Sequence, residues 1–302
     1  MTRLPHPIPY QGSKRNLAAA ILGVVGNRCA RLFEPFAGSA ALSLAASSRG
    51  TADRFVIGDS LVPLIGIWSC ILKSPSTLAK SYAEIWNGQE DSDENYYASV
   101  REEFNRTKDP ARLLYLLARC VKNSPRWNRE GLFNQSQDKR RLGMRPEKMT
   151  HQLAGAHALL HGKTETVAGD FAQIIEDAGP RDLVYLDPPW EGTSTGRDTR
   201  YHSGLARERL IAVLETLNQR GVPWLLSYDG QCGAKTYGTA LPADLRATRL
   251  ELNAGRSSQA TLNGRSDVTI ESLYVSPALA SSGPRELRAK PTQTTLFGSG
   301  HA

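Results

Sequence analysis

The sequence predicts an α/β fold with one mostly parallel sheet of seven strands, the last strands antiparallel, and a helical insert. Strand-like runs alternate with helical patterns over residues 31–72 and again over 164–227, and this alternation is typical of βαβ units. Between these stretches, residues 74–163 carry helical patterns without strand-like runs. Two final strand-like runs, 247–252 and 268–275, have no helix between them, so we expect them to pair antiparallel.

Charge is the unusual feature of an otherwise ordinary globular composition. The 302 residues are 40% hydrophobic and 22% charged, and a chain of this length can bury a substantial core. The formal net charge is +7. The segment between positions 119 and 148 contains nine basic residues and only three acidic ones. These basic residues are Arg119, Lys122, Arg126, Arg129, Lys139, Arg140, Arg141, Arg145 and Lys148. With Trp127 and Phe133 interleaved as rings that could contact bases, they favour nucleic-acid binding over a solvated basic face.

Cysteine and histidine spacing indicates neither a disulfide framework nor a metal site. The four cysteines lie far apart and form no CxxC pair. His157 and His161 are spaced to share a helix face, but no third ligand is near them in the sequence. The N-terminus lacks a signal-peptide core, and the apolar run 17–25 is too short to span a bilayer. We therefore expect a cytoplasmic protein without a membrane segment or a metal.

Two turns near the N-terminus have the composition of ligand-binding loops. Tyr10-Gln11-Gly12-Ser13-Lys14 precedes a helical pattern, where backbone N–H groups are free and Lys14 adds a positive charge. Residues 31–41 predict a strand, a tight turn of small residues around Gly38, and the start of a helix. Since the turn has one glycine, it lacks the GxGxxG pattern of nicotinamide-dinucleotide sites.

Two later strands are each followed by an acidic residue. The first ends in Asp59, about twenty residues after Gly38, where nucleotide-binding sheets place an acid that binds a ribose diol. The alternative for Asp59 is an N-cap of the helix 61–72, and the local pattern weighs the two evenly. The second strand, 164–168, is followed by Asp170-Phe171.

The most informative stretch is Asp187-Pro188-Pro189-Trp190, directly after the strand-like run 183–186. Prolines cannot extend a hydrogen-bonded ladder, so the strand ends here, at the carboxyl edge where open α/β sheets bind ligands. An acid held there beside rigid carbonyls and an aromatic ring suits a planar group that carries an amine. The alternative is an ordinary strand end with an Asp-Pro turn. The loop that follows contains Tyr201 and His202.

The last residues, 277–302, are rich in Ser, Pro, Gly and Ala and predict a disordered tail. Its exception is Gln293-Thr294-Thr295-Leu296-Phe297, a short apolar anchor typical of docking peptides. The chain contains neither a GxSxG elbow nor a GxxxxGK[ST] loop. Serine-hydrolase and P-loop functions are therefore not indicated.

Taken in order, these motifs resemble those of the Dam-like DNA adenine methyltransferases, the alpha group of amino-methyltransferases that use S-adenosylmethionine. The resemblance covers about residues 8–275 and rests on the two N-terminal turns, Asp59, Asp170-Phe171 and Asp187–Trp190. It implies a Rossmann-like methyltransferase sheet. The implied domains are a catalytic domain of residues 1–73 and 164–276, a target-recognition insert of residues 74–163, and the tail, 277–302.

The resemblance also implies roles for single residues. The cofactor site would include Tyr10, Lys14, Glu34, Pro35, Phe36, Ala37, Gly38 and Ser39, with Lys14 and the turn at 36–39 at the methionine end. Asp59 would bind the ribose hydroxyls, and Asp170 with Phe171 would contact the cofactor's adenine ring. Asp187, also beside the cofactor, would form the catalytic motif with Pro188, Pro189 and Trp190. The residues assigned to DNA are Lys122, Arg126, Trp127, Arg129, Lys139, Arg140, Arg141, Tyr201 and His202.

Trp190 bears on which base is methylated. Family members usually have Tyr at this place, and cytosine-modifying relatives commonly combine Ser with Pro-Pro-Trp, whereas Asp187 resembles the adenine branch. We therefore predict transfer of a methyl group to the N6 amine of a flipped adenine in duplex DNA. The alternatives are cytosine-N4 methylation, a non-catalytic DNA-binding module on the same fold, and a dinucleotide oxidoreductase.

Partners and cellular setting are likewise implied by the resemblance. It implies a bacterial or phage protein of the kind found in restriction–modification, acting on duplex DNA as a cytoplasmic, nucleoid-associated monomer. Gln293, Leu296 and Phe297 resemble the peptide by which bacterial replication proteins dock on the sliding clamp.

Overall fold

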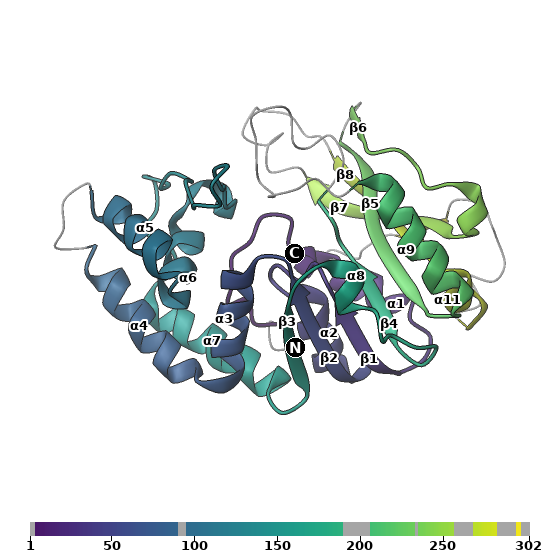
Figure 1. Ribbon diagram of the computed structural model, residues 1–302, viewed down its shortest axis with the longest axis horizontal. Coiled ribbons are helices and arrows are strands. Elements are labelled where there is room, and N and C mark those ends of the chain that lie inside the picture. Colours follow the sequence, from purple (N-terminus) through teal and green to yellow (C-terminus); the bar gives the residue numbers. More distant parts are fainter. Residues whose placement is uncertain are drawn as a thin grey trace.

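The computed structural model describes residues 4–89, 95–189, 206–232, 235–256, 268–282 and 294–296. One mixed sheet has helices against both faces, and a lobe of helices lies beside it (Figure 1). The strands are β1 (Cys29–Glu34), β2 (Ala52–Asp59), β3 (Thr164–Ala168), β4 (Leu183–Leu186), β5 (Trp224–Cys232), β6 (Lys235–Tyr237), β7 (Thr248–Arg256), β8 (Val268–Val275) and β9 (Thr294–Leu296). The helices are α1 (Ala18–Gly23), α2 (Ala41–Arg49), α3 (Val62–Lys73), α4 (Pro75–Asn87), α5 (Tyr96–Thr107), α6 (Pro110–Arg119), α7 (Pro146–Leu160), α8 (Phe171–Ile174), α9 (Arg207–Gln219) and α11 (Pro277–Ser282).

The sheet has the strand order β3-β2-β1-β4-β5-β8-β7-β9, and β6 pairs with β5 outside this row. The strands from β3 to β5 are parallel neighbours, and β8 lies antiparallel to both β5 and β7. The seven predicted strands are all present, and the prediction of a mostly parallel sheet with antiparallel last strands is confirmed. The short strands β6 and β9 were not predicted.

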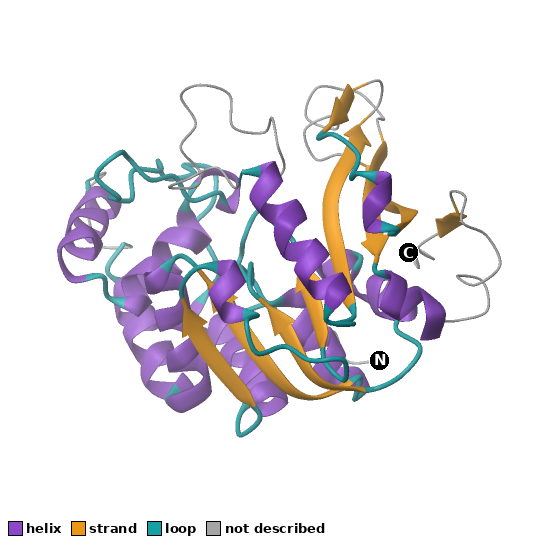
Figure 2. Ribbon diagram, turned by 45° about the vertical axis from the view of Figure 1, so that its right-hand side comes forward, coloured by secondary structure: helices purple, strands orange, loops and turns teal. Residues whose placement is uncertain are grey.

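Helices on both faces explain why the central strands are apolar throughout (Figure 2). In β4, Leu183 and Tyr185 belong to the hydrophobic core that contains residues of α1, α2 and α3. Val184 and Leu186 belong to the other core, with residues of α8 and α9. A parallel strand that is covered on both faces needs an apolar side chain at every position, and all four of these residues are buried.

The carboxyl ends of β1 and β4 meet at the topological switch point of the sheet. The chain continues from β1 outward to β2 and β3, but from β4 to β5 in the opposite direction. Ligands of open α/β sheets bind at such a point, outside the carboxyl ends of the strands. Glu34 ends β1, Asp59 ends β2 and Asp187 directly follows β4. The topology therefore brings three of the predicted site residues to one edge.

The insert is a helical lobe built around α6. This helix begins at Pro110, which suits the first turn, and Asp109 caps it by accepting a bond from the Arg112 N–H at 2.8 Å. Its residues from Leu113 to Leu117 are all buried, because α3, α4 and α5 pack around it. α7, which was not predicted, returns the chain to the sheet along α4 and α3.

A long loop between α6 and α7 carries seven of the nine basic residues between positions 119 and 148. Within it, Trp127 and Phe133 form a β-bridge and pack edge to face with 5.4 Å between ring centroids. Phe104 of α5 contacts both rings at 6.1 Å, and all three side chains are buried. The three rings form the core that fixes this loop.

Part of the tail has regular structure, so the prediction of disorder is wrong for those residues. Residues 277–282 form α11, which begins where the Ser276 hydroxyl accepts a bond from the Trp224 N–H at 2.9 Å. Residues 294–296 pair in parallel with β7. None of the described helices combines the length and the apolar surface that crossing a bilayer requires.

Candidate active site

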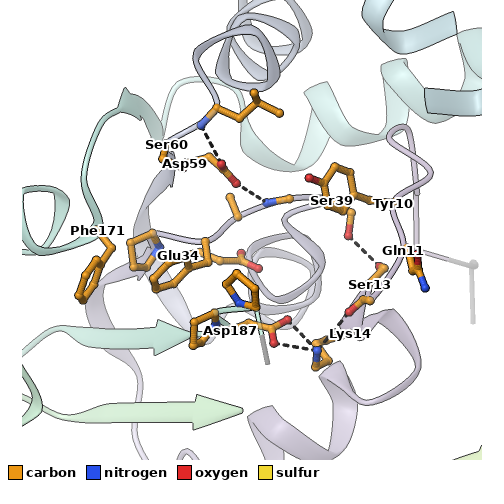
Figure 3. Close-up of a pocket in the computed structure, with 18 of the residues that line it drawn as sticks. Tyr10, Gln11, Ser13, Lys14, Glu34, Ser39, Asp59, Ser60, Phe171 and Asp187 are labelled. Carbon is orange, nitrogen blue, oxygen red and sulfur yellow. Dashed lines mark hydrogen bonds and ion pairs between the residues drawn. The ribbon is translucent and has the colours of Figure 1, made fainter. Parts of the chain in front are cut away.

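A cavity of about 770 Å3 opens at the switch point. It is lined by the segment before α1, the carboxyl ends of β1, β2 and β4, part of β8, and the insert loop at residues 124–131. This volume is typical of sites for small organic ligands. Figure 3 shows the polar side chains at the cavity, among them Lys14, Asp59 and Asp187.

The two predicted N-terminal turns lie together and form one wall of the cavity. Gly38 has φ +48°, a conformation that favours glycine, and a Cβ added there would lie 3.4 Å from the Tyr10 ring. The hydroxyls of Ser13 and Ser39 join the turns at 2.7 Å (Figure 3). The Tyr10 ring therefore packs against Gly38, and the turn that contains Phe36 and Ser39 lines the cavity beside it.

Glu34 stabilises the start of α2 beside this wall. Its carboxylate accepts bonds from the Ser43 N–H at 2.9 Å, the Ser43 hydroxyl at 2.5 Å and the Leu42 N–H at 3.4 Å. Burial raises the pKa of Glu34 to about 7, although these bonds act in the other direction. Glu34 lines the cavity, but its oxygens are engaged with α2, so it positions the turn that the ligand would contact.

Asp59 connects the end of β2 to the turn after β1. Its Oδ2 accepts the Gly38 N–H at 3.1 Å, and its Oδ1 accepts the Leu61 N–H at 3.0 Å. The N-cap position of α3 is Leu61, so the alternative of Asp59 as that N-cap is wrong. Burial raises the pKa of Asp59 to about 6, against the lowering effect of the backbone bonds. The Ser60 backbone is a third donor to Asp59. Since a carboxylate has about four acceptor sites, about one remains for a ligand.

The third predicted part of the cofactor site lies at the start of α8. The rings of Phe36 and Phe171 stack with 5.2 Å between centroids. Asp170 caps α8 by accepting the Ala172 N–H at 3.0 Å and also pairs with Arg209 at 2.5 Å. The Arg209 guanidinium lies 5.2 Å from the centroid of Phe171. These groups form an aromatic and polar corner of the same cavity.

The Asp187 carboxylate is held by Lys14. The Lys14 ammonium lies 2.7 Å from Asp187 Oδ1 and 2.8 Å from Oδ2, and Glu271 Oε2 lies 3.7 Å from the same nitrogen. The three side chains are 8%, 18% and 16% exposed for Lys14, Asp187 and Glu271, respectively. Burial raises the pKa of Asp187, and the Lys14 charge opposes that rise. Lys14 was expected at the methionine end of the cofactor. In the structure it forms an ion pair with Asp187.

Two cavity residues, Arg209 and Glu271, were missed by sequence reasoning. Arg209 lies in the first turn of α9, 39 residues after the acid it contacts. Glu271 lies on β8, opposite Gly230 of β5 in the ladder. Neither has a local motif, and only the strand order predicts their approach, because β8 lies next to β5 rather than at the sheet edge.

The basic residues of the insert divide into two groups. Arg119 is buried and donates to the backbone carbonyls of Asp138 and Arg141, and Arg141 donates to the Cys120 carbonyl at 2.7 Å. These two arginines hold the loop together. Five other insert residues assigned to DNA are exposed: Lys122, Arg126, Arg129, Lys139 and Arg140. Trp127, also assigned to DNA, is buried and lines the cavity.

Several predicted residues lie outside the described part of the chain: Trp190, Tyr201, His202, Gln293 and Phe297. His157 and His161 stack at 4.5 Å, and their Nδ1 atoms contact the carbonyls of Ile71 and Leu72. Within the described ranges, no group of three potential ligands could hold a metal ion.

Comparison with known proteins agrees with this geometry. The chain matches the D12 class N6 adenine-specific DNA methyltransferase family over residues 10–257. It is 29% identical to the DNA N-6-adenine-methyltransferase of Escherichia phage P1 over 66% of this chain, and it spans 26% of that protein. It is 25% identical to the Type II methyltransferase M1.LlaDCHI of Lactococcus lactis subsp. cremoris, over 72% of this chain and 78% of the relative.

Two further likenesses were found. The DNA adenine methylase of Escherichia coli (strain K12) is 27% identical to this chain. The matched region is 65% of this chain and 70% of that protein. Among solved structures, an rRNA methyltransferase aviRa from Streptomyces viridochromogenes matches 91% of this chain and 90% of its own, at 14% identity and a TM-score of 0.41.

The region that matches the family model includes the cavity residues Tyr10, Asp59 and Asp187. The match confirms the resemblance predicted from the motifs, and it decides between the two candidate bases in favour of adenine. The chain therefore belongs to the D12 class N6 adenine-specific DNA methyltransferase family.

Proposed function

We propose that this protein transfers a methyl group from S-adenosylmethionine to the N6 amine of an adenine turned out of duplex DNA at a specific sequence. The observation that carries the proposal is the position of Asp187 at the switch point, in one cavity with the Gly38 turn and Asp59. A cofactor against the turn and an amine at Asp187 would share that cavity. Direct transfer requires this proximity.

The residues of the cavity fit this cofactor. The turn of small residues around Gly38 suits the methionine end, the remaining acceptor site of Asp59 suits a ribose hydroxyl, and the stacked rings of Phe36 and Phe171 suit an adenine ring. Five carboxylates and two basic side chains line the cavity, an excess that suits a positively charged centre. When bound, the cofactor supplies a methyl group activated by its sulfonium.

Asp187 would activate the adenine amine. An exocyclic adenine amine is a poor nucleophile because its lone pair is delocalised into the ring. If Asp187 and the Pro188 carbonyl accept its two hydrogens, the nitrogen is drawn toward tetrahedral geometry and the lone pair is freed toward the methyl group. Asp187 must be ionised for this task, and its contact with the Lys14 ammonium favours the ionised form.

Proximity and orientation would supply much of the barrier reduction. In well-oriented systems this effect is on the order of 7–11 kcal/mol. Turning the base out of the duplex costs roughly a few kcal/mol, and stacking on an aromatic side chain such as Trp190 would return about 1–3 kcal/mol.

The insert would bind the duplex and select the target. The exposed basic residues Arg126, Arg129 and Lys139 lie on the insert loop. Four other residues of this loop line the cavity: Ser124, Pro125, Trp127 and Gly131. A backbone held by these side chains would therefore bring a base close to Asp187. Phosphate contacts of this kind fix the position of a duplex, while a few base contacts select the sequence.

The direct test is methylation of unmodified duplex DNA by the purified protein with S-adenosylmethionine, followed by nucleoside analysis. We expect N6-methyladenine in the product. N4-methylcytosine, or no modified nucleoside from a protein that binds both ligands, would contradict the proposal.

We further propose that the tail docks on the replication sliding clamp through Gln293–Phe297. The stretch lies beyond the family match, which ends at residue 257, and its described part is extended, as Thr294–Leu296 pairs with β7. Deleting residues 283–302 is expected to abolish capture by immobilised clamp without changing methylation of naked DNA. Full capture of the shortened protein would contradict this proposal.

A further inference from the structure

Glu271 is a second carboxylate at the ammonium that holds Asp187. It projects from β8, and its Oε2 lies 3.7 Å from Lys14 Nζ, whereas both Asp187 oxygens lie within 2.8 Å of that nitrogen. Lys14 also donates to the Gly12 carbonyl at 3.1 Å. The ammonium is therefore between two acids from two different strands, in tight contact with one and just beyond hydrogen-bond distance of the other.

One carboxylate oxygen of Glu271 lacks a hydrogen-bond donor in the part of the chain that the structure describes. Its Oε2 is buried and accepts no hydrogen bond from the described residues. A buried acceptor without a hydrogen-bond donor destabilises the folded state, and more so if it is charged. The charged or titratable groups that act on Glu271 are Lys14, Asp187 and the buried phenol of Tyr185, and only Lys14 is a cation. A group of this kind is retained at a stability cost when it serves the site.

The charges of this cluster do not balance. With both acids ionised, Lys14 compensates one carboxylate and leaves one negative charge at the place where the methyl group must be transferred. A sulfonium that delivers its methyl to an amine at Asp187 must lie within a few ångströms of this charge. After transfer the donor has become a neutral thioether, which this charge does not attract.

Glu271 also offers Lys14 a second partner. An amine hydrogen that bonds to Asp187 would share the two carboxylate oxygens with the ammonium, which now contacts both of them. A movement of less than one carbon–carbon bond length would bring Lys14 Nζ into hydrogen-bond distance of Glu271 Oε2. The ammonium can therefore shift without leaving an ion pair.

We propose that Glu271 is a positioning residue that shares Lys14 with Asp187 and makes the site prefer the cationic methyl donor over its neutral product. The inference rests on the proposed function and adds to it a reason why product release is not blocked by the affinity that binds the donor. Glu271 touches neither reacting group; it acts through Lys14 and through its charge.

Calorimetry with Glu271→Gln tests the charge directly. We expect the Kd for S-adenosylmethionine to rise about tenfold to a hundredfold, as a unit charge at this range predicts. The Kd for S-adenosylhomocysteine should change by less than about twofold, since that ligand has no sulfonium. Glu165→Gln, an exposed residue of β3, makes the same charge change away from the cavity and should leave both constants unchanged.

A conservative variant separates charge from packing. Glu271→Asp keeps the charge and should retain most of the preference for the donor, even if Glu271→Gln folds poorly. Equal losses of affinity for both ligands, or a donor preference as low in Glu271→Asp as in Glu271→Gln, would overturn the inference.

Kinetics give a second readout. At saturating donor and DNA, Glu271→Gln should lower kcat about tenfold or more, because Lys14 then keeps its full contact with Asp187. An unchanged kcat together with an unchanged donor-to-product ratio would overturn the inference while the proposed function stands. A wild-type protein that binds neither ligand would instead overturn the proposed function and, with it, this inference.

Discussion

In the cavity at the switch point, the acidic side chains are held by hydrogen bonds or ion pairs, whereas in the insert most of the basic residues between positions 119 and 148 are exposed. Asp59 ends β2, Asp187 directly follows β4, and both have defined donors within 3.1 Å. In the insert, Arg119 is buried on backbone carbonyls, while Arg126 and Arg129 are exposed a few residues away on the loop. The end of a strand determines where its side chain lies in the fold. The number of charged residues in a segment does not determine which of them are buried and which are exposed.

The difference separates two kinds of function. Chemistry at a reacting atom needs groups that are already oriented, so its residues are buried and hydrogen-bonded. Binding of a duplex backbone needs positive charge that water and counterions can leave, so its residues are exposed. The predictions below change one region at a time, from the largest expected effect to the smallest.

Removing the catalytic carboxylate is expected to have the largest effect. In Asp187→Ala, methyl transfer should fall by at least about 10^3-fold, because the amine loses its ionised acceptor. The affinity for S-adenosylmethionine should stay within about tenfold, since the contacts of the turn and of Asp59 remain. Single-turnover kinetics and calorimetry measure the two quantities, and retained turnover would contradict the role of Asp187.

A buried arginine of the insert should affect stability rather than chemistry. Arg119→Ala removes bonds to the Asp138 and Arg141 carbonyls and to Gln89 Oε1 at 3.0 Å. We expect the free energy of unfolding to fall by roughly 2–4 kcal/mol. The matched change Arg126→Ala should lower it by less than about 0.5 kcal/mol, since that side chain is exposed. Urea unfolding compares the two, and equal losses would contradict the division of the insert arginines.

The exposed arginines should affect DNA binding rather than stability. The double variant Arg126→Ala/Arg129→Ala should weaken DNA binding roughly tenfold or more, and the salt dependence should flatten by about 0.9 in log–log slope for each phosphate that is no longer neutralised. The pair Lys73→Ala/Lys80→Ala removes the same charge from exposed positions on α3 and α4. If both pairs change the slope equally, the loop does not bind DNA specifically.

The smallest expected effect is on the pH dependence of cofactor affinity. The pKa of Asp59 is raised to about 6, and the ionised form is the better acceptor for ribose hydroxyls. Affinity should therefore fall as the pH drops below 6, by up to about tenfold per unit. Asp59→Asn should bind more weakly at pH 7 and lose this dependence. Calorimetry at pH 5, 6 and 7 measures the affinity of both proteins for S-adenosylmethionine. An identical pH dependence in Asp59→Asn would contradict the assignment of Asp59 to the ribose hydroxyls.

The same carboxyl should affect stability with the opposite sign in the ligand-free protein. Because the folded pKa of Asp59 lies above its ordinary value, the folded state binds the proton more tightly than the unfolded chain. Its contribution to stability is therefore complete below the ordinary pKa of an aspartate, and it is lost as the pH rises through about 6. Thermal unfolding of the wild type and of Asp59→Asn over this range measures the contribution.

The fold and the first acids of the site follow from local sequence patterns, for a physical reason. Alternating apolar runs and helical patterns determine which segments become parallel strands, and parallel strands place their carboxyl ends at one edge. Asp59 and Asp187 could therefore be expected together although they are far apart in the chain. The same reasoning anticipated the antiparallel last strands.

What could not be predicted depends on tertiary packing. Glu271 reaches Lys14 because β8 lies between β5 and β7, an order that no local pattern contains. Trp127 and Phe133 are adjacent to many basic residues in the sequence, yet both pack on Phe104 in the core of the loop. The burial of Arg119 likewise depends on the course of a loop whose residues are mostly polar.

The central claim is tested most directly by expressing the protein in a bacterial host that lacks DNA methylation and sequencing its DNA for modified bases. Wild-type protein should produce N6-methyladenine at one recurring sequence, and Asp187→Ala, present at the same level, should produce none. N4-methylcytosine, an absence of modified bases with well-folded wild-type protein, or equal methylation by the variant would contradict the account.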